Sequence, residues 1–209
     1  MENDKHSKGS TGTQIAPLYG LVLSGGKSTR MGSDKGQISY HGRPQREYLY
    51  ELLENVCQEV FISIREEQQD SFTGAFNFIY DANLYRGPFN GILSAHARFP
   101  NAAWMVLACD LPLIDLPTLR LLNDSRRVDM DATALATEKS GLPEPLAAIW
   151  EPGGLEKAGI YLQDAESSCP RKFLINAVTH LVTPETDDLL VNANSMEEYM
   201  EVREQLSSK

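Results

Sequence analysis

Short, almost uninterrupted runs of apolar residues recur along the chain, and they constrain its fold more than any other feature. The first is Leu-Tyr-Gly-Leu-Val-Leu, which begins at Leu18. A strand buried on both faces of a parallel sheet has this pattern, whereas a strand with one solvent-facing side alternates apolar and polar residues. The runs predict seven strands, at residues 18–23, 60–64, 76–80, 104–108, 132–136, 145–150 and 177–182.

Amphipathic segments with the periodicity of helices separate most of these runs. Helices are predicted at residues 47–57, 90–98, 117–123, 155–163, 170–176 and 195–206. The last opens with Ser195 as an N-cap and Glu198 as its partner in a capping box. Alternating strands and helices build βαβ units, so we expect an α/β fold, a three-layer α/β/α sandwich with a mostly parallel, Rossmann-like sheet. Ligands of such sheets bind at the carboxyl ends of the strands.

Length and composition favour one domain. The chain has 209 residues, of which 42% are hydrophobic, enough for a single domain at residues 18–209 with a sizeable core. Residues 1–17, of which 1–14 are polar, contain almost nothing that could be buried and predict a disordered N-terminal leader rather than a signal peptide. No apolar run approaches the roughly 20 residues that a membrane span needs.

The charge balance excludes several classes of partner. Lys and Arg number 19 against 29 Asp and Glu, a net charge of −10, which disfavours binding to nucleic acid or an anionic membrane. Three cysteines without a CxxC pair argue against a disulfide framework and a thiolate zinc site, and favour the reducing cytoplasm. The four histidines show no metal-ligand spacing.

A glycine-rich, basic loop follows the first predicted strand. Residues 24–36 hold four glycines, two lysines and one arginine. Glycines bring backbone N–H groups close to an anion, while Arg30 and Lys35 offer a guanidinium fork and a point charge. The loop therefore predicts a triphosphate cradle. Gly26-Lys27-Ser28 is similar to the end of a P-loop, but the first P-loop glycine would fall at position 21, which is leucine.

Residues 23–35 match the pattern Leu-x-Gly-Gly-x-Ser-x-Arg-Met-Gly-x-Asp-Lys at every specified position. This pattern resembles the signature of the MobA family of molybdenum cofactor guanylyltransferases. The resemblance implies a sheet of the nucleotide-diphospho-sugar-transferase type, GTP and molybdopterin as substrates, and Mg²⁺ as cofactor. It also implies that Leu23 binds the nucleotide, and that the backbone of residues 24–26 (Ser24, Gly25 and Gly26) and the side chain of Arg30 hold the triphosphate. Arg30 and Lys35 would be catalytic, and Lys35 would also bind the nucleotide.

Three further segments resemble the family's nucleotide and metal sites. Asp110 follows the strand at 104–108 within a Cys-Asp-x-Pro segment, where the resemblance implies a catalytic magnesium ligand that also contacts the nucleotide. Gly87 and Pro88 belong to a Gly-Pro-x-x-Gly turn that the family places against the nucleotide. Asp81 falls where relatives carry a carboxylate near the base, although an ordinary turn aspartate fits the sequence nearly as well.

The predicted acceptor residues lie in the last quarter of the chain. Asn192 and Asn194 alternate on a short extended segment that resembles the family's Asn-x-Asn-Thr-Pro, with Ser195-Met196 in place of Thr-Pro. Arg171 falls where relatives keep basic residues for the acceptor's phosphate, although a solvated helix start is as compatible with it. Glu144 replaces a glutamine of relatives, and its charge would repel a phosphorylated acceptor unless it is paired or turned away.

Together these resemblances imply an enzyme that transfers GMP from GTP to the terminal phosphate of molybdopterin and releases pyrophosphate. A CTP-dependent molybdopterin cytidylyltransferase or another nucleotidyltransferase of the same fold is the nearest alternative, and Gly25-Gly26 with Asp34 favours the guanylyl branch. A non-catalytic nucleotide-binding regulator is an alternative from another class. Proteins of molybdenum cofactor biosynthesis, and those that receive the cofactor, are possible partners.

Overall fold

A computed structural model describes residues 15–24 and 35–207 of the chain. Within them seven strands form one sheet, and their ends differ from the predicted runs by at most two residues. They are β1 (Leu18–Leu23), β2 (Glu59–Ile64), β3 (Phe78–Tyr80), β4 (Ala103–Ala108), β5 (Ala132–Ala136), β6 (Pro143–Trp150) and β7 (Thr179–Val182).

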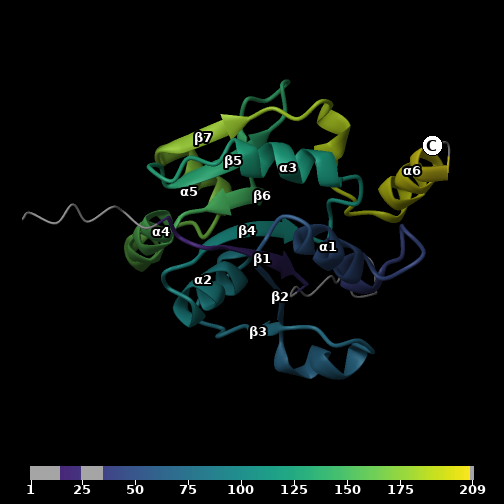
Figure 1. Cartoon of the computed structure of the whole chain (residues 1–209), viewed down its shortest axis with the longest axis horizontal. Helices are drawn as coiled ribbons and strands as arrows, with labels where there is room; N and C mark the ends of the chain where they lie inside the picture. The colour runs from purple at the N-terminus through teal and green to yellow at the C-terminus, as the bar shows by residue number, and fades with distance from the viewer. Residues whose placement is uncertain (1–14, 25–34, 208–209) are drawn as a thin grey trace, which may run out of the picture.

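The sheet order is β3-β2-β1-β4-β6-β5-β7, which Figure 1 shows from bottom to top. All neighbouring strands run parallel except at β6, which is antiparallel to both β4 and β5. The predicted mostly parallel sheet is therefore confirmed. Because β6 is reversed, its first residues lie at the edge where the other strands end.

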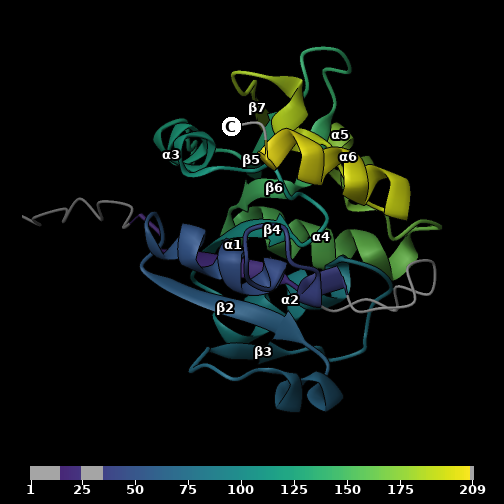
Figure 2. The same cartoon turned by 90° about the vertical axis from the view of Figure 1, so that its right-hand side faces the viewer.

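Helices cover both faces of the sheet, as Figure 2 shows from the edge. Leu49 and Leu53 of α1 (Gln45–Glu54) and Leu119 of α3 (Leu116–Asp124) pack into the core of one face. Three helices fill the other face: α2 (Phe89–Arg98), α4 (Pro152–Asp164) and α5 (Pro170–Asn176). The core there is rich in aromatic rings, with Trp150 stacked on Phe173 at a centroid distance of 5.9 Å. These layers confirm the predicted three-layer sandwich.

The last helix, α6 (Met196–Ser207), lies beyond the carboxyl ends of the strands, on the right of Figure 1. Its Val202 packs with Leu113 and Ala193 in a small separate cluster. The predicted capping box is present, because Glu198 N donates to Ser195 Oγ at 3.2 Å and Ser195 N donates to Glu198 Oε2 at 2.8 Å. The packing of Val202 against Leu113 holds α6 beyond this edge of the sheet.

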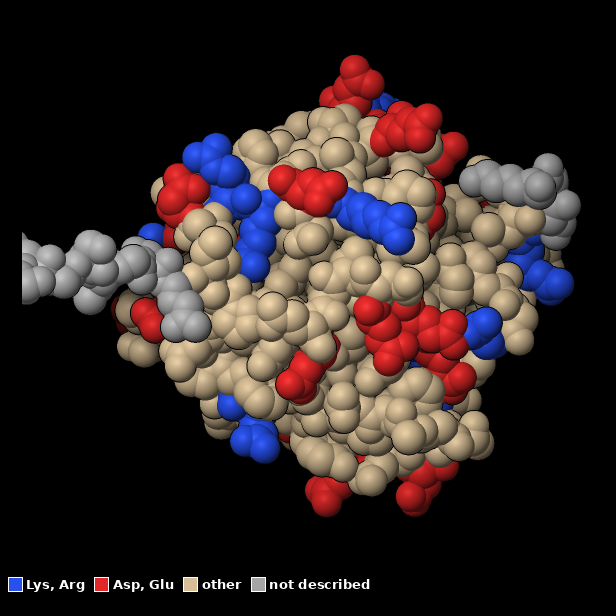
Figure 3. Space-filling model, in the orientation of Figure 1, with Lys and Arg blue, Asp and Glu red and all other residues tan. Residues whose placement is uncertain are grey.

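The predicted leader lies outside the described residues up to position 14. Of its last residues, Ala16 accepts a hydrogen bond from Arg126 Nη2 at 3.0 Å and Pro17 accepts one from Ala103 N at 2.9 Å. No helix within the described ranges is long and apolar enough to cross a membrane. Figure 3 shows acidic and basic side chains scattered over one face in small groups.

Candidate functional site

The carboxyl ends of β1, β2, β3 and β4 meet at one edge of the sheet, and the glycine-rich loop leaves β1 there. Three of the predicted phosphate-binding residues, Gly25, Gly26 and Arg30, lie outside the described residues. Leu23 ends β1, Ser24 follows it, and Lys35 begins the short 3-10 helix η1 (Lys35–Gln37). The start of the loop is therefore at the expected edge, and η1, which follows the loop, contacts α1.

The first residue of this loop is held by two contacts that the sequence did not predict. Ser24 N donates to Ser63 O of β2 at 3.1 Å, and Gln68 Nε2 donates to Ser24 O at 3.3 Å. Gln68 lies in the 3-10 helix η2 (Glu66–Ser71), is 6% exposed, and also accepts a hydrogen bond from Arg65 N at 2.9 Å. These contacts fix the direction in which the chain enters the predicted triphosphate cradle.

The predicted Gly-Pro turn requires its glycines. Gly87 has a φ of +65°, in the left-handed region that glycine adopts without strain. Pro88 then precedes the first residue of α2. At Gly91 a Cβ atom would lie 2.3 Å from Ser63 Oγ and 2.8 Å from Leu23 Cδ2, so only glycine lets α2 approach β1 and β2 this closely.

Asp81, which follows β3, is bound to its neighbours. Its Oδ1 accepts a hydrogen bond from Ser63 Oγ at 2.6 Å. Burial raises the pKa of Asp81, although hydrogen bonds from Ser63 and Asn90 and the charge of Arg65 act in the opposite direction. The carboxylate therefore helps to hold the segment between β3 and α2, whatever it contributes to nucleotide recognition.

A hollow of about 530 Å³ brings together residues from segments far apart in the sequence. Asp110 reaches it from the end of β4, and Ala193 N donates to Asp110 O at 2.9 Å, which joins the C-terminal segment to this strand end. Six predicted site residues line the hollow: Gly87, Pro88, Asp110, Arg171, Asn192 and Asn194. Leu23, Ser24 and Asp81 are not among the residues that line it.

Glu144, at the start of β6, also lines the hollow, and it is paired. Its Oε2 accepts a hydrogen bond from Arg171 Nη2 at 2.5 Å, and its Oε1 accepts one from Leu146 N at 3.2 Å. Burial raises the pKa of Glu144, against the opposing effect of Arg171, and the charge of Asp110 raises it further. The repulsion that the sequence suggested between Glu144 and an anionic acceptor is therefore offset by Arg171.

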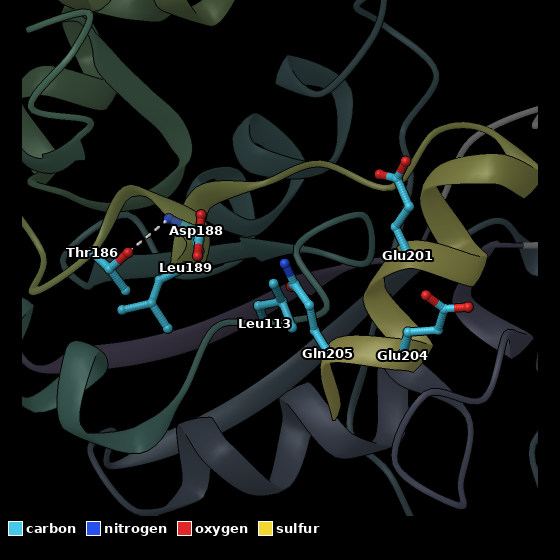
Figure 4. Close-up of a pocket in the computed structure, with 7 residues that line it drawn as sticks. All are labelled: Leu113, Thr186, Asp188, Leu189, Glu201, Glu204 and Gln205. Atoms are coloured by element: carbon cyan, nitrogen blue, oxygen red, sulfur yellow. Dashed lines mark hydrogen bonds between the residues drawn. The ribbon is translucent and has the colours of Figure 1, made fainter. Parts of the chain in front are cut away.

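A second hollow of about 620 Å³ lies between α6 and the 3-10 helix η3 (Asp187–Leu190). Figure 4 shows Asp188 on η3 and Glu201 and Glu204 on α6 around it. Its charged lining residues are all acidic, and none of the predicted site residues lines it. An anionic substrate is repelled there, so the first hollow is the better candidate site.

Sequence comparison relates the chain to known proteins. A family model described as "MobA-like NTP transferase domain" matches residues 20–180. The molybdenum cofactor biosynthesis bifunctional protein of Synechocystis is 36% identical over 93% of this chain, which spans 56% of that protein's length. The molybdenum cofactor guanylyltransferase of Pseudomonas entomophila is 30% identical over 85% of this chain and 93% of its own length.

The fold also matches that of solved structures. The molybdopterin-guanine dinucleotide biosynthesis protein A of Archaeoglobus fulgidus superposes with a TM-score of 0.73 at 22% identity, over 91% of this chain and 100% of its own. The CMP-2-keto-3-deoxy-manno-octonic acid synthetase gives a TM-score of 0.64 at 16% identity, over 92% of this chain and 98% of its own. At such identities the likeness establishes the fold alone.

Proposed function

Because the chain belongs to the MobA-like NTP transferase family, we propose that it is a molybdenum cofactor guanylyltransferase that uses GTP and molybdopterin. The observation that carries the proposal is the hollow at the carboxyl edge of the sheet. Asp110, Arg171 and the two asparagines, Asn192 and Asn194, come from three separate segments and line this one space. The predicted triphosphate cradle starts one strand away, after β1.

The proposed reaction needs no covalent enzyme intermediate. A terminal phosphate oxygen of molybdopterin attacks the α-phosphorus of GTP in line, a new P–O–P linkage forms, and the bond to the bridging oxygen of the β-phosphate breaks. Pyrophosphate leaves with the bonding electron pair. Both reactants are anions, so the work of the protein is to neutralise charge and to align the two phosphates.

Each group of residues has a part in that alignment. The backbone at residues 24–26 and the side chain of Arg30 bind the triphosphate, and Lys35 stabilises charge that develops at the α-phosphate. Arg171 and the two asparagines, Asn192 and Asn194, bind the acceptor in the hollow. The acceptor phosphate is thereby directed at the nucleotide.

The donor set of the hollow fits Mg²⁺ that arrives with a nucleotide. No group of three acidic, histidine or cysteine side chains suited to a metal occurs within residues 15–24 and 35–207. Magnesium in nucleotide sites is usually held by one or two carboxylates and by substrate phosphates, so the single carboxylate of Asp110 suffices. When bound there, the metal would supply Lewis-acid stabilisation of the phosphate charges.

A thermal-shift panel with GTP, CTP, ATP and UTP, each with and without Mg²⁺, tests nucleotide binding. A ligand at 100 times its Kd adds about 2.7 kcal/mol of stability, which corresponds to a rise in Tm of roughly 5–11 °C in a domain of this size. We expect that shift with GTP and Mg²⁺. A shift with CTP alone would indicate a cytidylyltransferase, and no shift with any nucleotide would overturn the proposal.

Pyrophosphate release then separates an enzyme from a regulator. With GTP, Mg²⁺ and molybdopterin together we expect stoichiometric pyrophosphate and a guanylated product. Stabilisation by GTP without pyrophosphate release would instead indicate a non-catalytic nucleotide-binding protein.

A further inference from the structure

The ion pair between Glu144 and Arg171 is built into the wall of the candidate site. Arg171 lies in the first turn of α5, where its Nε donates to Pro143 O at 3.0 Å and its Nη2 to Glu144 Oε2 at 2.5 Å. The guanidinium is thus held by two consecutive residues at the start of β6. Because guanidinium N–H groups are coplanar, two such contacts fix the plane of the group.

The two partners differ in exposure, and this difference leaves the cation available to a ligand. The Glu144 side chain is 10% exposed, whereas that of Arg171 is 46% exposed. Together with Asn192 they line both the main hollow and a smaller neighbouring hollow of about 190 Å³. The pair therefore forms part of the wall shared by the two hollows. The guanidinium of Arg171 is the more exposed partner, and the carboxylate of Glu144 is the more buried one.

Another ion pair, just beyond the other end of β6, shows what a stabilising pair looks like in this fold. At the far end of β6, Arg126 donates to both carboxylate oxygens of Glu151, at 2.6 and 2.9 Å. Their side chains are 11% and 5% exposed, so both charges are buried. Neither residue lines any of the three hollows described above. The pair of Glu144 and Arg171 differs because its cation is open to a candidate site.

We propose that Glu144 is a positioning residue that holds the guanidinium of Arg171 toward the hollow, where Arg171 binds a phosphate group of the acceptor. This inference rests on the proposed function. Glu144 accepts one of the two hydrogen bonds that fix Arg171, and Pro143 O accepts the other. Because the charge of Glu144 is offset by the pair, the carboxylate organises the anion site without closing it to anions. A glutamine at this position could accept the same hydrogen bond, but without the charge that strengthens it.

The substitution Glu144→Gln distinguishes positioning of Arg171 from simple charge repulsion, because the two roles predict opposite changes in the acceptor KM. If Glu144 only adds negative charge, its removal favours an anionic acceptor and lowers the acceptor KM. If Glu144 positions Arg171, the loss of a charge-assisted hydrogen bond raises the acceptor KM by about tenfold. We expect the second result, with the KM for GTP and the midpoint of thermal unfolding both close to wild type.

A double-mutant cycle shows whether Glu144 acts through Arg171. We expect Arg171→Ala to raise the acceptor KM by tenfold or more, and Glu144→Gln to add nothing further in the Arg171→Ala background, because residues that act as one unit are not additive. Full additivity of the two effects, or an unchanged or lower acceptor KM in Glu144→Gln, would overturn the inference. Glu151→Gln is the matched control, since it neutralises a paired glutamate at the other end of β6 and should leave both KM values unchanged.

Direct binding distinguishes failure of this inference from failure of the proposed function. The Kd of molybdopterin for wild type, Glu144→Gln and Arg171→Ala can be measured by equilibrium dialysis without GTP. Weaker binding to both variants supports positioning even if the wild type forms no guanylated product, a result that would overturn the proposed function alone. Equal Kd values for wild type and Glu144→Gln would overturn the positioning role while leaving product formation intact. No binding to wild type would overturn both.

Discussion

Asp81 combines a partly buried carboxylate with a position at the functional edge of the sheet. Burial raises its pKa above the ordinary value of 3.8. Ionisation therefore costs folding stability above the folded-state pKa, and this cost disappears as the pH falls below the pKa of the unfolded chain. In Asp81→Asn the amide oxygen can still accept the hydrogen bond from Ser63 Oγ. We expect this variant to unfold at the same or a higher temperature than wild type at pH 7, and to lose any advantage toward pH 4.

The exposed residue Asp129 provides a control, because its pKa is shifted in the opposite direction to that of Asp81. The hydrogen bond from Arg127 lowers the pKa of Asp129, so Asp129→Asn should gain no stability at pH 7. An Asp81→Asn variant that melts well below wild type at pH 7 would contradict the expected sign. In the same variant, the ratio of kcat/KM for GTP and CTP tests the predicted contact with the base, which is a separate property from stability.

The 3-10 helix η2 is an element whose role depends on one buried side chain. In Gln68→Ala the hydrogen bonds to Ser24 O and from Arg65 N are both lost. We expect a loss of about 1–3 kcal/mol of stability, since each hydrogen bond contributes roughly 0.5–1.5 kcal/mol. The KM for GTP should also rise by about two- to tenfold, because the start of the triphosphate loop becomes less ordered before binding.

Gln69, the neighbour of Gln68 in η2, provides the matched control. Gln69 is exposed, and its Oε1 accepts a hydrogen bond from Tyr80 OH at 2.7 Å, whereas Gln68 donates to Ser24 O. Gln69→Ala should leave the KM for GTP unchanged. If both variants alter KM equally, the effect belongs to η2 as a whole and not to the contact between Gln68 and Ser24.

Regular elements were predictable from the sequence because burial on a sheet or helix leaves a periodic pattern. All seven strands and the six α-helices occur where periodicity and capping residues indicated them. The 3-10 helices η2 and η3 were not predicted, since each spans six residues or fewer, too short to show a period. The contacts that order η2, such as that between Gln68 and Ser24, join residues 44 positions apart and leave no local signal.

The direction of β6 shows the limit of sequence reasoning at the scale of the whole molecule. A central strand buried on both faces has the same apolar pattern whether it runs parallel or antiparallel to its neighbours. The reversal of β6 places Glu144 beside Arg171 at the functional edge. The sequence motifs predicted that Asp110, Arg171 and Asn192 belong to one enzyme site, but only the three-dimensional arrangement pairs Arg171 with Glu144.

The same reversal places the other end of β6, with Glu151, at the opposite edge of the sheet, where Arg126 ties it to Ala16. One edge thus carries the candidate site, and the other carries the ion pair of Arg126 and Glu151, whose side chains are 11% and 5% exposed and which stabilises the fold. Arg126→Ala leaves the Glu151 carboxylate buried without its cation, which should cost about 3–5 kcal/mol and lower Tm by roughly 6–20 °C. Below the new transition, the KM values for GTP and for the acceptor should match wild type, as measured by pyrophosphate release. A change of either KM in the folded variant would show that the two edges are energetically coupled. Arg126→Lys keeps the charge but loses the bidentate contact with Glu151, so its Tm should lie between those of wild type and Arg126→Ala.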